Sequence, residues 1–396
     1  MSRFILLLCF IVVVVQGDWI NITPRFGLPG VAFDISCVDS SDCYMAGGDN
    51  SGNTAMVYRF NGSQSGVVRS TNLTAKGDLI LMTVAMEGSS GSPKGVAAGL
   101  SFLNSGIYYA TDPDTFTPAG DGLVFIAQSQ NARIAGSNAL VMMVGSGQGV
   151  AYSGDYGVTF TNFIIPIQAP GGGANARYGA IVDANTWYVA FGAWPENSFQ
   201  SLKSSDFYPY SAKYAYDRKL KKLVRKVKAP VEKPSGGYSA MIVKTSDGGK
   251  TWEKQYANNS TFYFNAIDCF DANNCAAVAE GFDQDAGVKV FQTTDGKTWN
   301  EVFSLPSNPG SDSYTFMAVR YTSAANIWVG GGHDQSLEKQ GVFYKSTDGG
   351  KTFALDSSPL DNIDTVTAMD FTTGGTGFAV GLSAATGGPA VLRYNP

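Results

Sequence analysis

The sequence predicts an all-β fold, a seven-bladed β-propeller with four-stranded blades. One unit recurs along the chain: an apolar strand, a short turn, a second strand ending in glycine, a loop, a third strand and a tight Asp/Gly turn. The glycines that end the second strands are 46 to 52 residues apart, except for one interval of 89, and they are Gly47, Gly99, Gly145, Gly192, Gly281, Gly330 and Gly381. Units of this length, built from short alternating strands, are typical of propeller blades.

The unit is complete in residues 265–299 and 317–353, and a looser copy spans residues 81–116. The last unit stops after its third strand, at residues 390–394, and lacks the Asp/Gly turn and the fourth strand. The segment DWINITP, which begins at Asp18, resembles the strand that follows the turn in other units. We therefore expect it to form the outermost strand of the final blade and to close the ring.

The first 17 residues have the pattern of a secretory signal peptide. Arg3 precedes an apolar run from Phe4 to Val15, and the small residue Gly17 follows. A membrane-spanning helix needs roughly 20 apolar residues, and no later run is long enough. We expect residues 1–17 to be removed and residues 18–396 to form one propeller, secreted or in the secretory-pathway lumen, monomeric and without a transmembrane anchor.

The overall charge gives no reason to expect a nucleic-acid partner. The net charge is −5 and the isoelectric point is about 5.0. Only 15% of residues are charged, whereas 44% are hydrophobic, which indicates a globular protein with a core.

Four cysteines remain after the signal peptide, and they form two pairs with the same C-x5-C spacing. In an exported protein, the repeated context favours two short bridges over a zinc site. We expect the bridges Cys37–Cys43 and Cys269–Cys275. Sequons for N-glycosylation fit a secreted surface and stand at Asn21, Asn61, Asn72, Asn258 and Asn259.

The Asp/Gly turns have a sharper pattern, S/T-x-D-x-G-x-T-W/F, in residues 153–160, 245–252 and 346–353, with a copy one residue shorter in residues 293–299. These turns resemble the Asp boxes, or BNR repeats, of the sialidase-like propeller superfamily. The single seven-blade length is most similar to photosystem II assembly-factor propellers and sortilin-type propellers. The resemblance implies that the turns lie between third and fourth strands, away from the usual ligand face. It implies a structural role for the aspartates Asp155, Asp247, Asp295 and Asp348.

The resemblance carries over no catalytic residue. Sialidases hold the substrate carboxylate with three arginines and use a tyrosine nucleophile, and no segment of this chain matches those motifs. A glycoside hydrolase using two carboxylates is another possibility. Its candidates are acidic residues expected on the loop-rich face of blades five and six, namely Asp283, Asp285 and Asp334. A set of solvated acidic loops is the alternative reading.

The same face is expected to carry ligand-binding residues. Asp49, in the loop sequence DNSGN, and His333, the single histidine, are the candidates. DNSGN and DQDAG contain oxygen donors of the kind that bind Ca²⁺, but neither completes a calcium-loop motif. We therefore expect no cofactor and no dedicated metal site, with Ca²⁺ as the only ion to consider.

Blade four contains a basic insertion at about residues 196–237. Residues 203–233 carry a net charge of +7, and residues 220–227 space their apolar side chains as a short amphipathic basic helix would. Three interpretations remain open. The insertion is a solvated loop, or a binding arm that uses Lys221, Lys222 and Arg225 to contact an acidic partner or the acidic top face of its own propeller, or a protease-processing site at Lys221-Lys222 or Arg225-Lys226.

The function predicted from the sequence is a secreted, non-enzymatic propeller. We expect it to bind a protein or glycan ligand on its loop-rich face, with the basic insertion contributing. The alternative is a glycoside hydrolase or lyase that uses the rim carboxylates of blades five and six.

Overall fold

The computed structural model describes most of the chain as strands and the turns that join them. The described residues are 17–23, 30–48, 54–62, 69–73, 78–101, 106–119, 128–144, 149–167, 175–193, 214–217, 222–225, 239–258, 262–281, 285–307, 312–335, 338–356, 360, 363–383 and 388–396. The predicted signal peptide lies outside these ranges, apart from Gly17.

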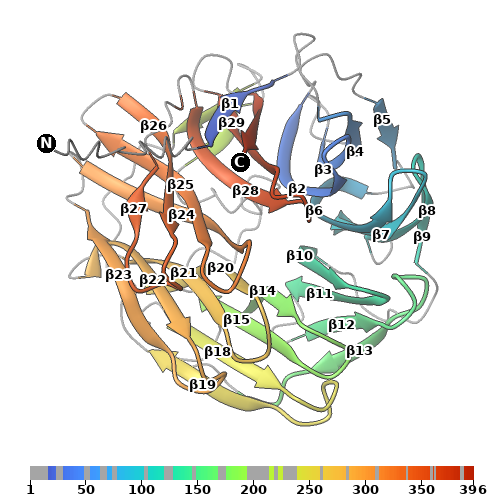
Figure 1. The fold of residues 1–396 in the computed structure, drawn as a ribbon. Helices are drawn as coiled ribbons and strands as arrows, with labels where there is room; N and C mark the ends of the chain where they lie inside the picture. Colours follow the sequence, from blue (N-terminus) through green and yellow to red (C-terminus); the bar gives the residue numbers. More distant parts are fainter. Residues whose placement is uncertain are drawn as a thin grey trace, which may run out of the picture.

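Seven antiparallel blades surround a central axis, as Figure 1 shows, which confirms the predicted fold. Blade 1 contains β2 (Val31–Asp39), β3 (Asp42–Gly48), β4 (Ala55–Phe60) and β5 (Arg69–Asn72). Blade 2 contains β6 (Asp78–Ser89), β7 (Ser92–Ser101), β8 (Ile107–Asp112) and β9 (Thr115–Pro118). Blade 3 contains β10 (Gln128–Ala135), β11 (Asn138–Val144), β12 (Gly149–Ser153) and β13 (Thr161–Ile164).

The remaining blades follow the same order from the axis outward. Blade 4 contains β14 (Asn175–Ile181), β15 (Trp187–Ala193), β18 (Ser239–Thr245) and β19 (Glu253–Asn258). Blade 5 contains β20 (Phe262–Cys269), β21 (Cys275–Gly281), β22 (Gly287–Thr293) and β23 (Asn300–Pro306). Blade 6 contains β24 (Asp312–Tyr321), β25 (Ile327–Gln335), β26 (Glu338–Ser346) and β27 (Ala354–Leu355). Blade 7 contains β28 (Ile363–Phe371), β29 (Gly377–Ser383), β30 (Pro389–Asn395) and β1 (Asp18–Asn21).

The N-terminal strand closes the ring, as the sequence predicts. β1 pairs antiparallel with β30, from Asp18 opposite Asn395 to Asn21 opposite Leu392. Trp19 is only 2% exposed. Its ring is stacked on that of Phe343 in blade 6, with 4.1 Å between centroids. The first strand therefore joins blades 6 and 7 through a buried aromatic contact.

All seven innermost strands bulge at the same place. The pairing of first and second strands shifts register in every blade, at residues 33, 82, 130, 177, 265, 317 and 367. A bulge re-aims the side chains that follow it. Residues at the same distance from the bulge are therefore equivalent in all blades.

Polar side chains one residue past the bulge join consecutive blades. The Asp34 carboxylate accepts hydrogen bonds from the Thr83 hydroxyl and the Val84 N–H, at 2.7 and 3.3 Å. The Thr83 hydroxyl in turn accepts the Ala132 N–H at 2.8 Å. Such bonds satisfy buried polar groups and fix each blade against the next.

The Asp/Gly turns are closed by their own side chains. In blade 4, the Thr251 N–H and hydroxyl donate to the two carboxylate oxygens of Asp247, at 2.8 and 2.6 Å. The Gly249 N–H donates to the Thr245 hydroxyl at 2.9 Å, and the φ of Gly249 is +85°, which favours glycine. The same hydrogen bonds occur in residues 153–159 and 346–352.

The aromatic residue that ends each turn packs towards the preceding blade. Trp299 of blade 5 meets Tyr188 of blade 4 edge to face, with 6.1 Å between centroids. Phe353 of blade 6 meets Phe303 of blade 5 at 5.4 Å. The turns thus stabilise the contacts between neighbouring blades.

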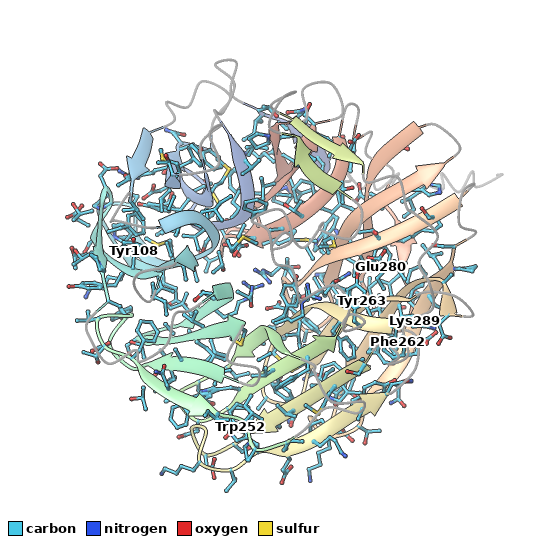
Figure 2. All side chains as sticks on the ribbon, turned by 180° about the vertical axis from the view of Figure 1, so that it is seen from behind. Tyr108, Trp252, Phe262, Tyr263, Glu280 and Lys289 are labelled. Atoms are coloured by element: carbon cyan, nitrogen blue, oxygen red, sulfur yellow. A yellow bond between two sulfur atoms is a disulfide. The ribbon has the colours of Figure 1, made fainter. Side chains whose placement is uncertain are left out.

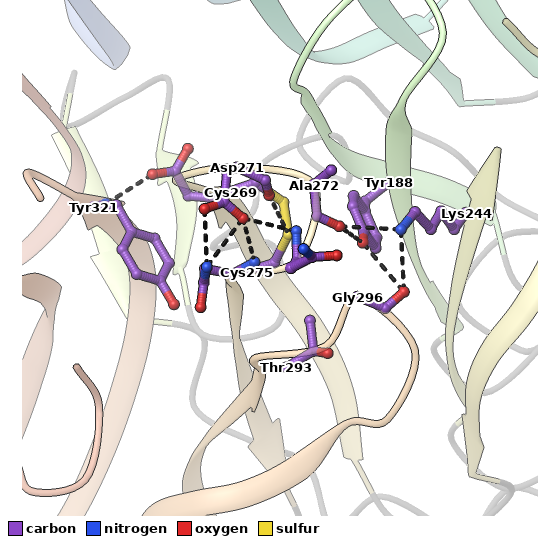
Figure 3. The surroundings of a disulfide bond; sticks show 12 residues. Tyr188, Lys244, Cys269, Asp271, Ala272, Cys275, Thr293, Gly296 and Tyr321 are labelled. Atoms are coloured by element: carbon purple, nitrogen blue, oxygen red, sulfur yellow. Dashed lines mark hydrogen bonds between the residues drawn. A yellow bond between two sulfur atoms is a disulfide. The ribbon is translucent and has the colours of Figure 1, made fainter. Parts of the chain in front are cut away.

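Both predicted disulfides are present. Cys37–Cys43 and Cys269–Cys275 each join the first and second strands of a blade, in blades 1 and 5. Figure 3 shows the turn that the second bridge closes. Lys244 and Tyr188 of blade 4 both donate hydrogen bonds to the Ala272 carbonyl of this turn, at 3.0 and 2.7 Å.

The insertion in blade 4 contains a hairpin where the sequence analysis expects a helix. β16 (Tyr214–Asp217) pairs antiparallel with β17 (Lys222–Arg225). The helix prediction is therefore wrong in this segment. The aromatic and β-branched residues of these strands favour extended backbone, and a helix this short is marginal in water. Within the described ranges, no helix has the length and apolar character needed to cross a membrane.

Candidate ligand-binding site on the propeller axis

A small cavity, partly open to solvent, lies where the seven innermost strands meet. Every blade contributes to its lining, so the fold itself builds it. Ligand sites in proteins are commonly concave, with apolar walls and a few placed polar groups. This cavity has both features.

Two arginines line the cavity three residues past the bulge. They are Arg133 on β10 and Arg320 on β24, and their side chains are 15% and 13% exposed. Arg133 donates one hydrogen bond, to the Ala132 carbonyl at 2.8 Å, and its Nε is buried without a hydrogen-bond partner in the described part of the chain. Arg320 donates to the Val319 carbonyl at 3.2 Å.

Three aspartates lie near these arginines, but too far away for hydrogen bonds. The shortest separations are 3.9 Å, for Arg133 to Asp34, Arg320 to Asp268 and Arg320 to Asp370. This is longer than a charge-assisted hydrogen bond.

The aspartates are held by other bonds instead. Asp268 accepts the Tyr321 N–H and Asp370 accepts the Cys37 N–H, both at 2.8 Å and both from the following blade. Asp34 accepts the bonds from blade 2 described above. The carboxylates therefore stabilise the contacts between blades. N–H groups of the arginines are left as hydrogen-bond donors for a ligand.

Burial changes the acid–base properties of the cluster. Burial, together with the positive charge of Arg320, lowers the pKa of Arg133 to about 10, so its guanidinium is still charged at neutral pH. Burial raises the pKa of Asp370, and this effect is opposed by Arg320 and by the Cys37 N–H.

The other part of the lining is apolar. Three alanines one residue past the bulge line the cavity, Ala266, Ala318 and Ala368, on three consecutive blades. Phe33, Met82 and Met317, at the bulge itself, also line it and are each less than 9% exposed. The cavity thus joins an apolar wall to an end that contains Arg133 and Arg320.

A second polar cluster lies between blades 5 and 6 and is buried. Glu280 accepts hydrogen bonds from the Tyr263 hydroxyl at 3.3 Å and the Thr315 hydroxyl at 3.0 Å (Figure 2). Glu280 is 5% exposed and Tyr263 is 2% exposed. Both side chains of this pair therefore lie inside the protein.

The structure describes only some of the residues that the sequence analysis proposes for the loop-rich face. His333 lies on β25, half-buried, with its ring stacked on that of Tyr314 at 4.1 Å. Asp285 stands just before β22, and Asp334 follows His333 on β25 as part of the backbone ladder. Asp49, Asp283 and Lys221 lie outside the described residues, whereas Lys222 and Arg225 are placed only as parts of β17. Convergence of the acidic trio therefore stays a prediction.

Most of the sequons stand near the outside of the ring. Asn21 is on β1, Asn72 on β5 and Asn258 on β19, which are the outermost strands of their blades. Asn61 is exposed just after β4, and Asn259 is outside the described ranges. Among the described histidines, cysteines and acids, no group of three could hold a metal ion.

The axial arginines and aspartates are absent from the sequence prediction, although a signal for them exists. The pattern Ala-x-Asp or Ala-x-Arg recurs at blade spacing, ending at Asp268, Arg320 and Asp370. A charge at the same position of several otherwise apolar first strands indicates a channel-facing residue. Recognising it requires the strands to be aligned on their bulges, and the bulges become visible only in the structure.

Comparison with known proteins supports the fold alone. No family model matches the sequence, and no curated protein matches it. Among solved structures, YCF48 bound to a D1 peptide is similar, with a TM-score of 0.58, 14% identity, and coverage of 97% of this chain and 98% of that chain. YCF48 from Cyanidioschyzon merolae has a TM-score of 0.55, 13% identity, and coverage of 96% and 99%.

A GH74 xyloglucanase from Xanthomonas campestris is also similar, with a TM-score of 0.51, 12% identity, and coverage of 93% of this chain and 54% of that chain. At such identities a likeness carries no function from one protein to another. It does establish that this chain has the architecture of a seven-bladed propeller.

Proposed function

We propose that this protein is a binding protein for a protein ligand, and that the ligand places a carboxylate in the axial cavity. The observation that carries the proposal is the unequal bonding of the charges there. The aspartates are engaged by backbone N–H groups of neighbouring blades, whereas Arg133 keeps a buried Nε without a partner and the arginine–aspartate separations are 3.9 Å.

A carboxylate suits these donors best among common ligand groups. Guanidinium presents several N–H groups in one plane, which match the two oxygens of a carboxylate. The two arginine side chains are only 15% and 13% exposed, and hydrogen bonds at such partly buried groups are stronger than on an open surface.

Two further observations support a protein ligand. A structurally similar propeller, YCF48, is described as bound to a D1 peptide, so this architecture can hold a peptide. The two disulfides fit an extracellular or lumenal protein, as expected for a secreted binding protein.

The proposal is tested with matched peptides that differ only in their C-terminal group. A library of peptides with free C-termini and the same library with amidated C-termini are titrated against the full-length mature protein by fluorescence polarisation. We expect binding that needs the free carboxylate and falls at least tenfold in Arg133→Met and Arg320→Met. Arg393→Met is the control, because Arg393 donates to the Gly62 carbonyl at a contact between blades 7 and 1. Equal binding of both libraries would overturn the proposal.

The hydrolase alternative is kept open by Asp285, which stands half-buried just before β22 on the side of the ring where the candidate rim acids are expected. Its test is hydrolysis of a polysaccharide panel by the wild-type protein and by Asp285→Asn. Activity that disappears in this variant would favour a hydrolase over a binding protein.

A further inference from the structure

The residue one past the bulge lines the cavity in six blades, and in three consecutive blades this residue is small. The position one residue past the bulge carries alanine in three consecutive blades, at Ala266, Ala318 and Ala368. The other four blades carry larger side chains at the same position, namely Asp34, Thr83, Asn131 and Tyr178. We call the three alanines the alanine wall.

Space left between side chains in a protein interior is unfavourable for folding unless water or a ligand occupies it. Protein interiors are packed as densely as organic crystals, and a cavity lowers stability in proportion to its volume. The wall residues are 3%, 5% and 8% exposed, so they lie in the interior. A larger residue in any of the three blades would fill part of the space.

The alanine wall lies close to the arginines of the cavity. Arg320 is on the same strand as Ala318, two residues further along, and both line the cavity. Met82 and Met317 line it as well, and the flexible thioether side chain adapts to the shape of a small apolar group. A ligand that reaches the arginines therefore has its next atoms against alanine and methionine.

We infer that the cavity selects a short aliphatic carboxylate, and that the alanine wall determines the size of the group attached to it. Such a group is present in a free small carboxylic acid and in the last residue of a peptide that ends in a small side chain. This inference rests on the proposed function and adds the size limit. The limit comes from Ala266, Ala318 and Ala368, whereas the charge requirement comes from the arginines.

The test uses two ligand series and four proteins. Acetate, propionate, isobutyrate and benzoate are titrated by calorimetry, alongside peptides that end in Gly, Ala, Val or Phe with a free or an amidated C-terminus. The proteins are the wild type, Ala318→Leu, Ala318→Gly and Ala85→Leu. Ala85 is buried on β6 and does not line the cavity, so its variant controls for overpacking of an innermost strand.

We expect the wild type to prefer small end groups. A peptide that ends in Phe should bind at least tenfold more weakly than one that ends in Ala. Ala318→Leu should bind every ligand at least tenfold more weakly. Ala85→Leu should bind as the wild type does, provided that its melting curve shows a folded protein. Ala318→Gly should shift the preference towards Val and isobutyrate, a gain that misfolding does not produce. Binding of the acids alone, with the small-group preference, would support the size limit and overturn the proposed protein ligand. Binding of the peptides alone, with the same preference, would support both.

Two results separate the failure of this inference from that of the proposed function. If free-carboxylate peptides bind regardless of their last side chain, and the Ala318 variants bind as the wild type does, the size limit is wrong and the proposed function stands. If neither series binds the wild-type protein, both are wrong.

Discussion

The Asp370 carboxylate accepts the backbone N–H of Cys37 at 2.8 Å, across the contact between the last blade and the first. The two residues are 333 positions apart in the sequence. The equivalent bond from Tyr321 to Asp268 joins blades 5 and 6. These bonds explain how the axis can contain aspartates close to arginines and still leave the arginines available, because each carboxylate is oriented by the next blade.

The bonding pattern predicts unequal stability effects for the two charge types. Asp34→Ala leaves the donors of Thr83 and Val84 buried without an acceptor, and should lower the free energy of unfolding by about 3 kcal/mol. Arg133→Met removes a poorly paired buried charge and should change it by less than about 1 kcal/mol. Urea unfolding of both variants checks this. A larger loss for Arg133→Met than for Asp34→Ala would show that the arginine is structural.

Closure of the ring depends on the aromatic anchor of the first strand. Trp19→Ala should lower the free energy of unfolding by about 3–5 kcal/mol, the usual cost of emptying a buried tryptophan site. Asn395→Ala, at an exposed residue of the adjoining strand, is the control and should stay within about 0.5 kcal/mol. The midpoint of denaturant unfolding measures both, and an equal effect of the two variants would mean that β1 does not hold the ring.

Each disulfide should contribute separately to stability. The bridges close short loops in blades 1 and 5, with a sequence separation of 6 residues each. Removing one pair, as Cys37→Ser with Cys43→Ser or Cys269→Ser with Cys275→Ser, should cost about 2 kcal/mol. The costs should add, because the pairs share no partners. Thermal unfolding with and without a reductant is the measurement, and a reductant should have no effect on the quadruple variant.

The pH dependence of stability should separate the turns from the axis. Hydrogen bonds from Thr251 and from the backbone lower the pKa of Asp247 to about 2, and Thr352 and its N–H do the same for Asp348. A lowered carboxyl pKa contributes stability that is complete above the ordinary value of 3.8 and is lost as the pH falls towards 2. The turns should therefore be intact at pH 4–7 and weaken only below that range.

Asp370 should act in the opposite direction. Because burial raises its pKa, its ionised form costs stability at neutral pH, and protonation recovers it as the pH falls towards 3.8. Glu87, whose pKa burial also raises, contributes in the same sense. The melting temperature of the wild type should hold or rise from pH 7 to pH 4 and then fall. Asp370→Asn should reduce the rise, and an unchanged profile in this variant would contradict the assignment.

The repeating parts of this fold are predictable from the sequence, and the axial site is not. Glycine spacing and the turn pattern predict the blades, because both are local features that each unit repeats. The paired context of Cys269 and Cys275 predicts their bridge for the same reason. Arg133 and Arg320 come together only after the ring has closed, from strands in blades 3 and 6, so no local pattern joins them. The helix predicted in the basic insertion is wrong because Leu223 and Val224 fit a helical spacing and a strand equally well.

A crystal structure of the protein with the peptide that binds it most tightly tests the central claim most directly. The claim predicts the peptide carboxylate in the axial cavity, within hydrogen-bond distance of Arg133 Nε and the Arg320 guanidinium, and Asp268 and Asp370 still bonded to Tyr321 and Cys37. A peptide bound on the outer rim or on the Asp/Gly turns, with the axial cavity holding only water, would contradict it.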